Sequence, residues 1–196
     1  MGSIEQIGRL ELGKDAHMTF HRDLSKPPDH PEHHFSFTVC SGSSSDSLAL
    51  QVPKHWHKHH DEYMQCVAGE IEVHLDGETF IAKAGDPTIF IERRRVHGFK
   101  FAKGQRVVLK EMTRPTGEFK QRFFEDVFTE AGFWGAMRGF ADGDTYLALP
   151  VPGWLRWLDE VYMFVMGLLA VLVYPRKGLR PESRAAVVGD EEKKEL

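Results

Sequence analysis

Short runs of alternating apolar and polar residues fill the first 115 positions of the chain, and turn residues separate them. Side chains alternate between the two faces of an extended strand, so this pattern predicts β-strands with one buried face. The predicted strands are His17–His21, His34–Cys40, Ser47–Val52, Glu62–Ala68, Glu70–Leu75, Thr79–Lys83, Thr88–Ile91, Val96–Phe101 and Arg106–Met112. Asp76-Gly77 between two apolar runs is typical of a hairpin, because Gly accepts the positive φ of a tight turn. Many short strands with tight turns predict a sandwich or a closed barrel.

After Thr113 the pattern changes. The segment Glu118–Glu130 has an apolar stripe at helical spacing, which predicts an amphipathic helix. The stripe consists of Phe119, Phe123, Phe124, Val127 and Phe128. Residues 140–153 carry Gly and Pro and are predicted to form a loop. We therefore divide the chain into an N-terminal arm (1–16), a barrel (17–115), a helical extension (116–175) and a charged tail (176–196).

The extension ends in Trp154–Tyr174, the most hydrophobic stretch of the chain. Its uncharged part, Val161–Tyr174, has 14 residues, short of the ~20 that a membrane-spanning helix needs. Aromatic residues near its ends and the following Arg176-Lys177 also resemble segments at membrane interfaces. Three interpretations compete: packing on the barrel, a homodimer interface, or peripheral membrane contact. We favour packing within the protein, because the preceding aromatic helix needs a partner.

The composition is that of an ordinary globular protein, with 28% charged and 41% hydrophobic residues. A net charge of −4 without a long basic run argues against a nucleic-acid partner. The two cysteines, Cys40 and Cys66, provide no disulfide framework, and the N-terminal residues have no apolar core typical of a secretory signal. We therefore expect a cytoplasmic protein, with membrane association as the alternative for residues 154–174.

The segment Pro53–Gly69 carries the candidate chemistry. His55 and His57 flank Trp56, and Glu62 follows. Residues two apart in a strand lie on the same face, about 6.7 Å apart, so the two imidazoles would lie side by side. Glu62 can return from the next strand, and His97 is a candidate fourth ligand. Imidazoles and a carboxylate suit a first-row divalent metal ion.

The spacing H-x-H-x4-E-x6-G, formed by His55, His57, Glu62 and Gly69, resembles the first signature motif of the cupins. Ala49 stands where that motif usually begins with Gly. Gly85 resembles the start of the second cupin motif, whereas the positions of its Pro and Gly hold Ile91 and Arg93, His97 comes one residue late, and Phe101 replaces its Asn. The likeness covers roughly residues 17–115.

This resemblance implies a mainly β fold: a single cupin barrel (a double-stranded β-helix, or jelly roll) followed by the helical extension. It also implies one divalent metal ion on His55, His57, Glu62 and His97. Such N/O ligands accept Fe, Mn, Zn, Ni, Cu or Co. Glu62 would serve as ligand and proton acceptor and His97 would complete the site; we name these two as catalytic candidates.

His59 shares the predicted face of His57, so these two histidines are an alternative pair. That pairing leaves only two residues before Glu62, too few for the turn that brings the carboxylate back. We therefore favour His55 and His57, and expect His59 and His60 to be turn residues exposed at the barrel mouth.

Alternation also predicts the pocket wall. Met64 and Cys66 share the inward face of Glu62, and Phe99 and Phe101 share that of His97. Such an apolar wall beside polar ligands suits a hydrophobic or aromatic small molecule, although for any single one of these residues we favour a place in the barrel core over contact with a ligand. The run Arg93–Arg95 either attracts an anionic substrate or forms a solvated edge, and we favour the edge.

The chain also resembles the small cupins of fungal secondary metabolism. That likeness implies a metal-dependent enzyme acting on an apolar, aromatic or polyketide-like molecule, and we favour dioxygenase-type oxidoreductase chemistry. Decarboxylase, isomerase and cyclase chemistry in the same pocket are alternatives. Two further hypotheses stay open: a non-catalytic small-molecule-binding cupin, and a metal-free cyclase or epimerase that uses His and Glu as acid and base.

Overall fold

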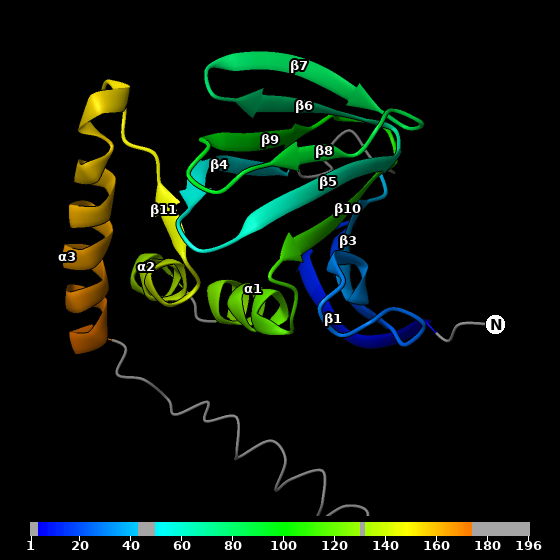
Figure 1. The fold of residues 1–196 in the computed structure, drawn as a ribbon, viewed down its shortest axis with the longest axis horizontal. Helices are drawn as coiled ribbons and strands as arrows, with labels where there is room; N and C mark the ends of the chain where they lie inside the picture. Colours follow the sequence, from blue (N-terminus) through cyan, green and yellow to red (C-terminus); the bar gives the residue numbers. More distant parts are fainter. Residues whose placement is uncertain (1–3, 43–49, 130–131, 174–196) are drawn as a thin grey trace, which may run out of the picture.

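The computed structural model describes residues 4–42, 50–129 and 132–173. They form two antiparallel β-sheets and three α-helices (Figure 1). The six-stranded sheet has the order β1 (Ile4–Gly13), β2 (Ala16–Asp23), β3 (His34–Cys40), β10 (Val107–Arg114), β5 (Asp61–Ala68) and β8 (Ile89–Ile91). The five-stranded sheet has the order β11 (Thr145–Leu147), β4 (Gln51–His57), β9 (His97–Phe101), β6 (Glu70–Leu75) and β7 (Glu78–Lys83).

The apolar faces of the two sheets pack against each other and form the core. Its buried members come from both sheets, among them Met64, Ile71, Val73, Phe99, Phe101, Val107 and Leu109. Inward-facing residues that alternate along antiparallel strands are typical of a jelly roll. The predicted mainly β fold with a C-terminal helical extension is therefore confirmed.

The predicted strands agree closely with those observed. β3 and β6 have the predicted ends, and β5, β7, β8, β9 and β10 differ by one or two residues. The exception is the predicted strand Ser47–Val52: residues 47–49 lie outside the described part of the chain, and β4 instead begins at Gln51 and continues to His57. The candidate ligands His55 and His57 therefore lie within a strand.

Gly69, the last residue of the first motif, joins β5 to β6. Its φ is +73°, and an added Cβ would collide with the carbonyl oxygen of Arg106. Glycine is required there for both reasons.

Two strands were not predicted. β1 lies in the predicted N-terminal arm and pairs with β2, but its register shifts between Gln6 and Gly8 and again between Glu11 and Gly13. These irregularities interrupt the period of two by which a strand is recognised in the sequence. β11 lies in the predicted loop 140–153 and pairs with β4, placing Thr145 opposite His57.

The extension contains α1 (Phe119–Thr129), α2 (Phe133–Asp142) and α3 (Trp157–Val173). α1 was predicted, although Glu130 lies outside the described residues, whereas α2 was not. Helix α2 packs against both α1 and α3, and α3 also contacts β11 (Figure 1). An added Cβ on Gly167 would lie 2.7 Å from the Ala141 side chain, so α3 and α2 approach closely.

A buried polar cluster fastens α3 to the barrel. Asp159 is completely buried; it accepts hydrogen bonds from Trp56 Nε1 (2.9 Å), the Leu149 amide (3.0 Å) and Arg156 Nη1 (3.0 Å). Packing of α3 within the protein, the favoured interpretation, therefore holds for one of its faces. Over the described residues, no helix is both long and apolar enough to cross a membrane.

Candidate metal centre

Four buried side chains from three strands meet inside the barrel: His55 and His57 on β4, Glu62 on β5 and His97 on β9. Their ligand atoms all lie within 4.8 Å of one another. Glu62 is at the centre: its Oε1 lies 3.1 Å from His57 Nε2 and its Oε2 lies 2.9 Å from His97 Nε2. His55 faces His97 across the β4–β9 pairing, with ring centroids 4.3 Å apart. The structure thus brings together the four predicted ligands.

The backbone fixes the orientation of all three imidazoles. The Nδ1 atoms of His55, His57 and His97 lie 2.8, 2.9 and 2.9 Å from the carbonyl oxygens of Pro53, Asp144 and Arg95. A carbonyl only accepts, so each Nδ1 must carry the proton, and in a neutral ring Nε2 then has a free lone pair. Metal-bound histidines commonly donate the N–H of their other ring nitrogen to a carbonyl oxygen in this way.

These lone pairs give a direct test of whether a metal ion fits. The Nε2 atoms of His57 and His97 are buried, lie close to Glu62 and yet make no hydrogen bond with acceptable geometry. Nitrogen lone pairs facing an ionised carboxylate repel unless a proton or a cation lies between them. A divalent cation would satisfy all of these atoms together, so the cluster fits a metal ion.

The protonation states agree with this fit. Burial lowers the pKa of His57 to about 4 and lowers that of His55 well below its ordinary value. Burial would raise the pKa of Glu62, but Lys120 and His57 outweigh it and hold that pKa well below the usual range. Neutral imidazoles with an ionised carboxylate are the forms in which these residues bind metal ions.

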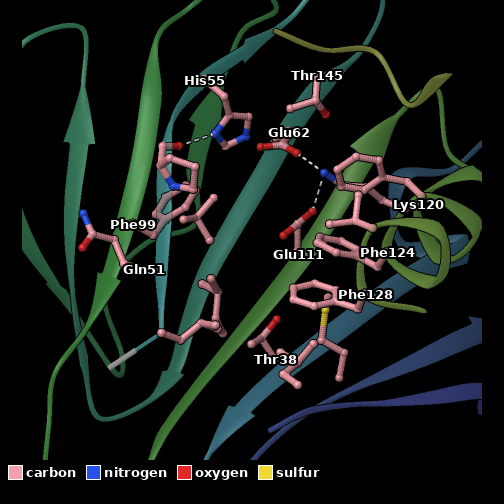
Figure 2. Close-up of a pocket in the computed structure, with 18 of the residues that line it drawn as sticks. Thr38, Gln51, His55, Glu62, Phe99, Glu111, Lys120, Phe124, Phe128 and Thr145 are labelled. Atoms are coloured by element: carbon pink, nitrogen blue, oxygen red, sulfur yellow. Dashed lines mark hydrogen bonds and ion pairs between the residues drawn. The ribbon is translucent and has the colours of Figure 1, made fainter. Parts of the chain in front are cut away.

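Lys120 on α1 is a functional residue that the sequence did not reveal. Its side chain is mostly buried, with 13% exposed, and its Nζ pairs with Glu62 Oε1 and lies 2.6 Å from Glu111 Oε1 on β10 (Figure 2). Burial opposes the charge of Lys120, but the two carboxylates outweigh it and raise its pKa. Burial is also the main reason that the pKa of Glu111 is raised. α1 therefore adds a cation to the ligand cluster.

His60 corrects another expectation. It is buried rather than exposed: its ring stacks on His57 with centroids 4.0 Å apart, and its Nδ1 lies 2.9 Å from Asp144 Oδ2. Phe119 of α1 packs on its other side, 5.2 Å away between centroids, which explains the burial. Burial opposes protonation, but Asp144 and Glu62 raise the pKa of His60. His59 is exposed, as predicted.

A cavity of about 130 Å³ adjoins the ligand cluster. Its polar end consists of His55, His57, Glu62, Glu111 and Lys120, and the rest is mainly apolar (Figure 2). Among the aromatic lining residues are Phe99 and Phe101 from the barrel, Phe123, Phe124 and Phe128 from α1, and Phe140 from α2. The extension therefore supplies much of the apolar wall.

Of the four predicted pocket residues, Met64, Phe99 and Phe101 line this cavity and Cys66 does not. Cys66 lies two residues beyond Met64 on β5, and its thiol donates weakly to the carbonyls of Ala68 and Gly69 at the strand end. Two residues of strand displace a side chain by about 6.7 Å, which carries Cys66 past the cavity into the core. His97 contacts Glu62 but also does not line the cavity.

Each of the three consecutive arginines lies close to an acidic side chain at the edge of the barrel. Arg93 pairs with Asp61 through Nη2 at 2.9 Å, Arg94 lies 3.9 Å from Glu160, and Arg95 lies 2.6 Å from Asp76. All three side chains are about half-exposed, and none lines the cavity. This placement agrees with the favoured interpretation, a solvated edge.

Comparisons with known proteins give one family and several distant structures. Residues 49–111 match the model of the cupin domain. No curated protein matches the chain. KdgF from Halomonas sp. is 17% identical with a TM-score of 0.43, and the alignment covers 57% of this chain and 88% of that one. An RmlC-like cupin from Shewanella frigidimarina is 17% identical with a TM-score of 0.42, and the alignment covers 57% of this chain and 86% of that one. CapF from Staphylococcus aureus is 12% identical with a TM-score of 0.45, and the alignment covers 74% of this chain and 34% of that one.

The matched residues 49–111 include all four clustered side chains and most strands of the five-stranded sheet. The two-sheet β architecture is the one that the family predicts. The family match therefore identifies residues 49–111, the part of the chain that holds the ligand cluster, as a cupin domain.

Proposed function

We propose that this protein is a metal-dependent cupin enzyme that acts on an apolar, aromatic small molecule by oxygenase-type chemistry. The observation that carries the proposal is the position of the ligand cluster: three of its members, His55, His57 and Glu62, form the polar end of a cavity whose other walls are mainly aromatic. Small-molecule sites combine an apolar lining with a few fixed polar groups in this way.

His55, His57, His97 and Glu62 would hold the metal ion, which when bound supplies Lewis-acid or redox chemistry at an oxygen atom of the substrate. The rings of Phe99 and Phe124 face the space in which the substrate would lie and would bind a flat molecule while excluding water (Figure 2).

Proton transfer is better assigned to Glu111 than to Glu62. Glu62 has a lowered pKa because Lys120 and His57 stabilise its charge, so it is a poor proton store. Burial raises the pKa of Glu111, whose side chain also lines the cavity. The Glu111 carboxyl can therefore hold a proton beside the substrate, with Lys120 joining the two acids.

The test is metal analysis of protein purified without chelator, comparing the wild type with His57→Ala and with His74→Ala. His74 is a β6 histidine that pairs with Thr79 and Glu72 outside the cluster. We expect about one metal ion per chain in the wild type and in His74→Ala, and a large loss in His57→Ala. Redox-active iron or copper would support the oxygenase assignment, and zinc would favour isomerase or cyclase chemistry. Metal-free wild-type protein that cannot be loaded would reject the proposal.

Lys120 favours a second candidate, because it already neutralises Glu62 without a metal ion. In this alternative the pocket is metal-free and either binds a small molecule without turnover or performs acid–base isomerisation or cyclisation. Ligand binding or turnover that survives prolonged chelation in wild-type protein would favour this candidate over the metal-dependent enzyme.

A further inference from the structure

Helix α3 leaves most of its apolar surface uncovered. Its buried stripe consists of Asp159, Met163, Gly167 and Ala170. Its exposed apolar residues are Trp157, Val161, Phe164, Val165, Leu168, Leu169, Val171, Leu172 and Val173, which together we call the α3 face. Leu172 is 80% exposed and Phe164 67% exposed. Isolated exposed apolar residues are normal, but a continuous patch of this kind marks an interaction surface.

The shape of the α3 face indicates what covers it. With 3.6 residues per turn, the exposed positions extend over roughly 200° of the helix circumference. A single partner helix covers a stripe about half as wide. A lipid bilayer, by contrast, can surround the whole of such an arc. No charged residue occurs from Val161 to Val173, so no part of this face would be costly to bury in lipid.

The residues at the two ends of α3 agree with lipid contact. Trp154, 78% exposed, and Trp157 lie at its beginning. Indole rings are enriched at the boundary between membrane and water. In the sequence, Arg176, Lys177 and Arg180 follow shortly after the helix, and cations at this position favour anionic headgroups.

The surroundings of the α3 face also favour lipid over a protein partner. A groove of about 640 Å³ runs between α2 and α3, and Val161, Phe164, Leu168 and Val171 of the α3 face line it. Phe140 and Thr145 line both this groove and the cavity at the ligand cluster, so the two spaces adjoin at these side chains. A protein on the α3 face would block the groove, whereas lipid would leave it open to an apolar substrate; this one consideration rests on the proposed function.

We propose that the α3 face docks the protein on the surface of a lipid bilayer, with the apolar side chains of α3 inserted among the lipids. Peripheral attachment of this kind buries an apolar face a short way into the bilayer and is strengthened by anionic lipids.

Vesicle flotation tests this proposal without requiring metal or turnover. Purified full-length protein is mixed with vesicles of phosphatidylcholine, alone or with about a third phosphatidylserine. The test variant is Leu168→Glu/Leu172→Glu, which places charges on exposed positions of the α3 face. The matched control is Ile81→Glu/Phe90→Glu, which adds the same charges at exposed apolar positions of β7 and β8. Circular dichroism and thermal unfolding check that the variants are folded.

We expect the wild type and the control to float with the vesicles, more strongly with phosphatidylserine, and the α3 variant to lose binding about tenfold. Brominated phosphatidylcholine should quench tryptophan fluorescence in the wild type and not in the α3 variant. No flotation of the wild type, or equal flotation of wild type and α3 variant, would overturn the proposal. A wild-type dimer that ignores vesicles and becomes monomeric in the α3 variant would also overturn it, and would assign the face to a second copy of the chain.

Discussion

The two walls of the cavity hold their polar side chains in different ways. On the barrel wall, the backbone carbonyls of Pro53 and Asp144 accept hydrogen bonds from the Nδ1 atoms of His55 and His57, so backbone geometry sets where the rings point; Asp144 lies just before β11, in the extension. On the helical wall, Lys120 pairs with the side chains of Glu62 and Glu111, and Phe124 and Phe128 on the same helix are partly or largely exposed. The difference suggests a division of labour: backbone carbonyls, one of them from the extension, fix the ligands, and the side chains of α1 adjust charge and shape without moving them.

Detaching the extension from the barrel tests this division most severely. Asp159→Ala should destabilise the protein by about 3 to 5 kcal/mol, because it leaves buried donors of Trp56 and Leu149 and the charge of Arg156 without their acceptor. Trp56 lies between the two ligands on β4, so metal affinity should also fall. Chemical denaturation with and without added metal measures both effects. Glu160→Ala, which removes a partly exposed partner of Lys58, is the control and should cost less than about 1 kcal/mol.

Removing the cation of the helical wall comes next. Lys120→Met leaves the buried Glu62 and Glu111 facing each other, and we expect a loss of about 3 kcal/mol in the free energy of unfolding. Adding Glu111→Gln should recover part of this loss, since one carboxylate no longer opposes another. Lys110→Met is the control, because Lys110 pairs with Glu32 away from the cavity. Equal losses in Lys120→Met and Lys110→Met would contradict the central position given to Lys120.

The sequence also predicts the barrel better than it predicts the extension. The period of two along the strands and the spacing of His55, His57 and Glu62 are local patterns, and they gave the fold class and the four clustered residues. One backbone partner, the carbonyl of Asp144 that accepts from His57, lies next to β11, a three-residue strand too short to show a period.

The extension was predicted less well because its structure depends on contacts between residues that are distant in the sequence. No helix was predicted at α2, which contains Gly135 and Gly139, and glycine disfavours helices; an added Cβ at Gly139 would lie 2.6 Å from a Val127 methyl, so this glycine serves close helix packing. Lys120 is adjacent to Phe119 in an ordinary amphipathic pattern, and nothing local indicates that it enters the barrel. His60 is buried by residues distant in the sequence, Asp144 and Phe119 of α1, as well as by His57.

The aromatic lining gives a smaller test of whether the extension can change without disturbing the ligands. Phe124→Ala should cost about 1 to 2 kcal/mol, less than a fully buried Phe, because this ring is only partly buried. It should enlarge the cavity and admit bulkier aromatic ligands while metal content stays unchanged. Calorimetric binding of a series of substituted phenols, with metal analysis in parallel, measures both. Phe99→Ala on the barrel wall is the comparison, and we expect it to disturb metal content because its ring lies against His97, 5.7 Å away between centroids.

The smallest expected effect belongs to the barrel edge, where Asp61 accepts from the Arg93 amide and guanidinium at 2.9 Å. The guanidinium lowers the pKa of Asp61, so the folded state favours the ionised carboxyl. The resulting stability is fully present above the ordinary pKa of an Asp and is lost as the pH falls through the lower pKa of the folded state. Asp61→Asn should therefore lower the free energy of unfolding at pH 7 by less than about 1 kcal/mol, since Arg93 is half-exposed and solvent screens the pair. The difference between variant and wild type should shrink as the pH falls below about 4. Urea denaturation at several pH values measures it, and a difference that grows toward low pH would show that the pair does not stabilise the barrel through the charge of Asp61.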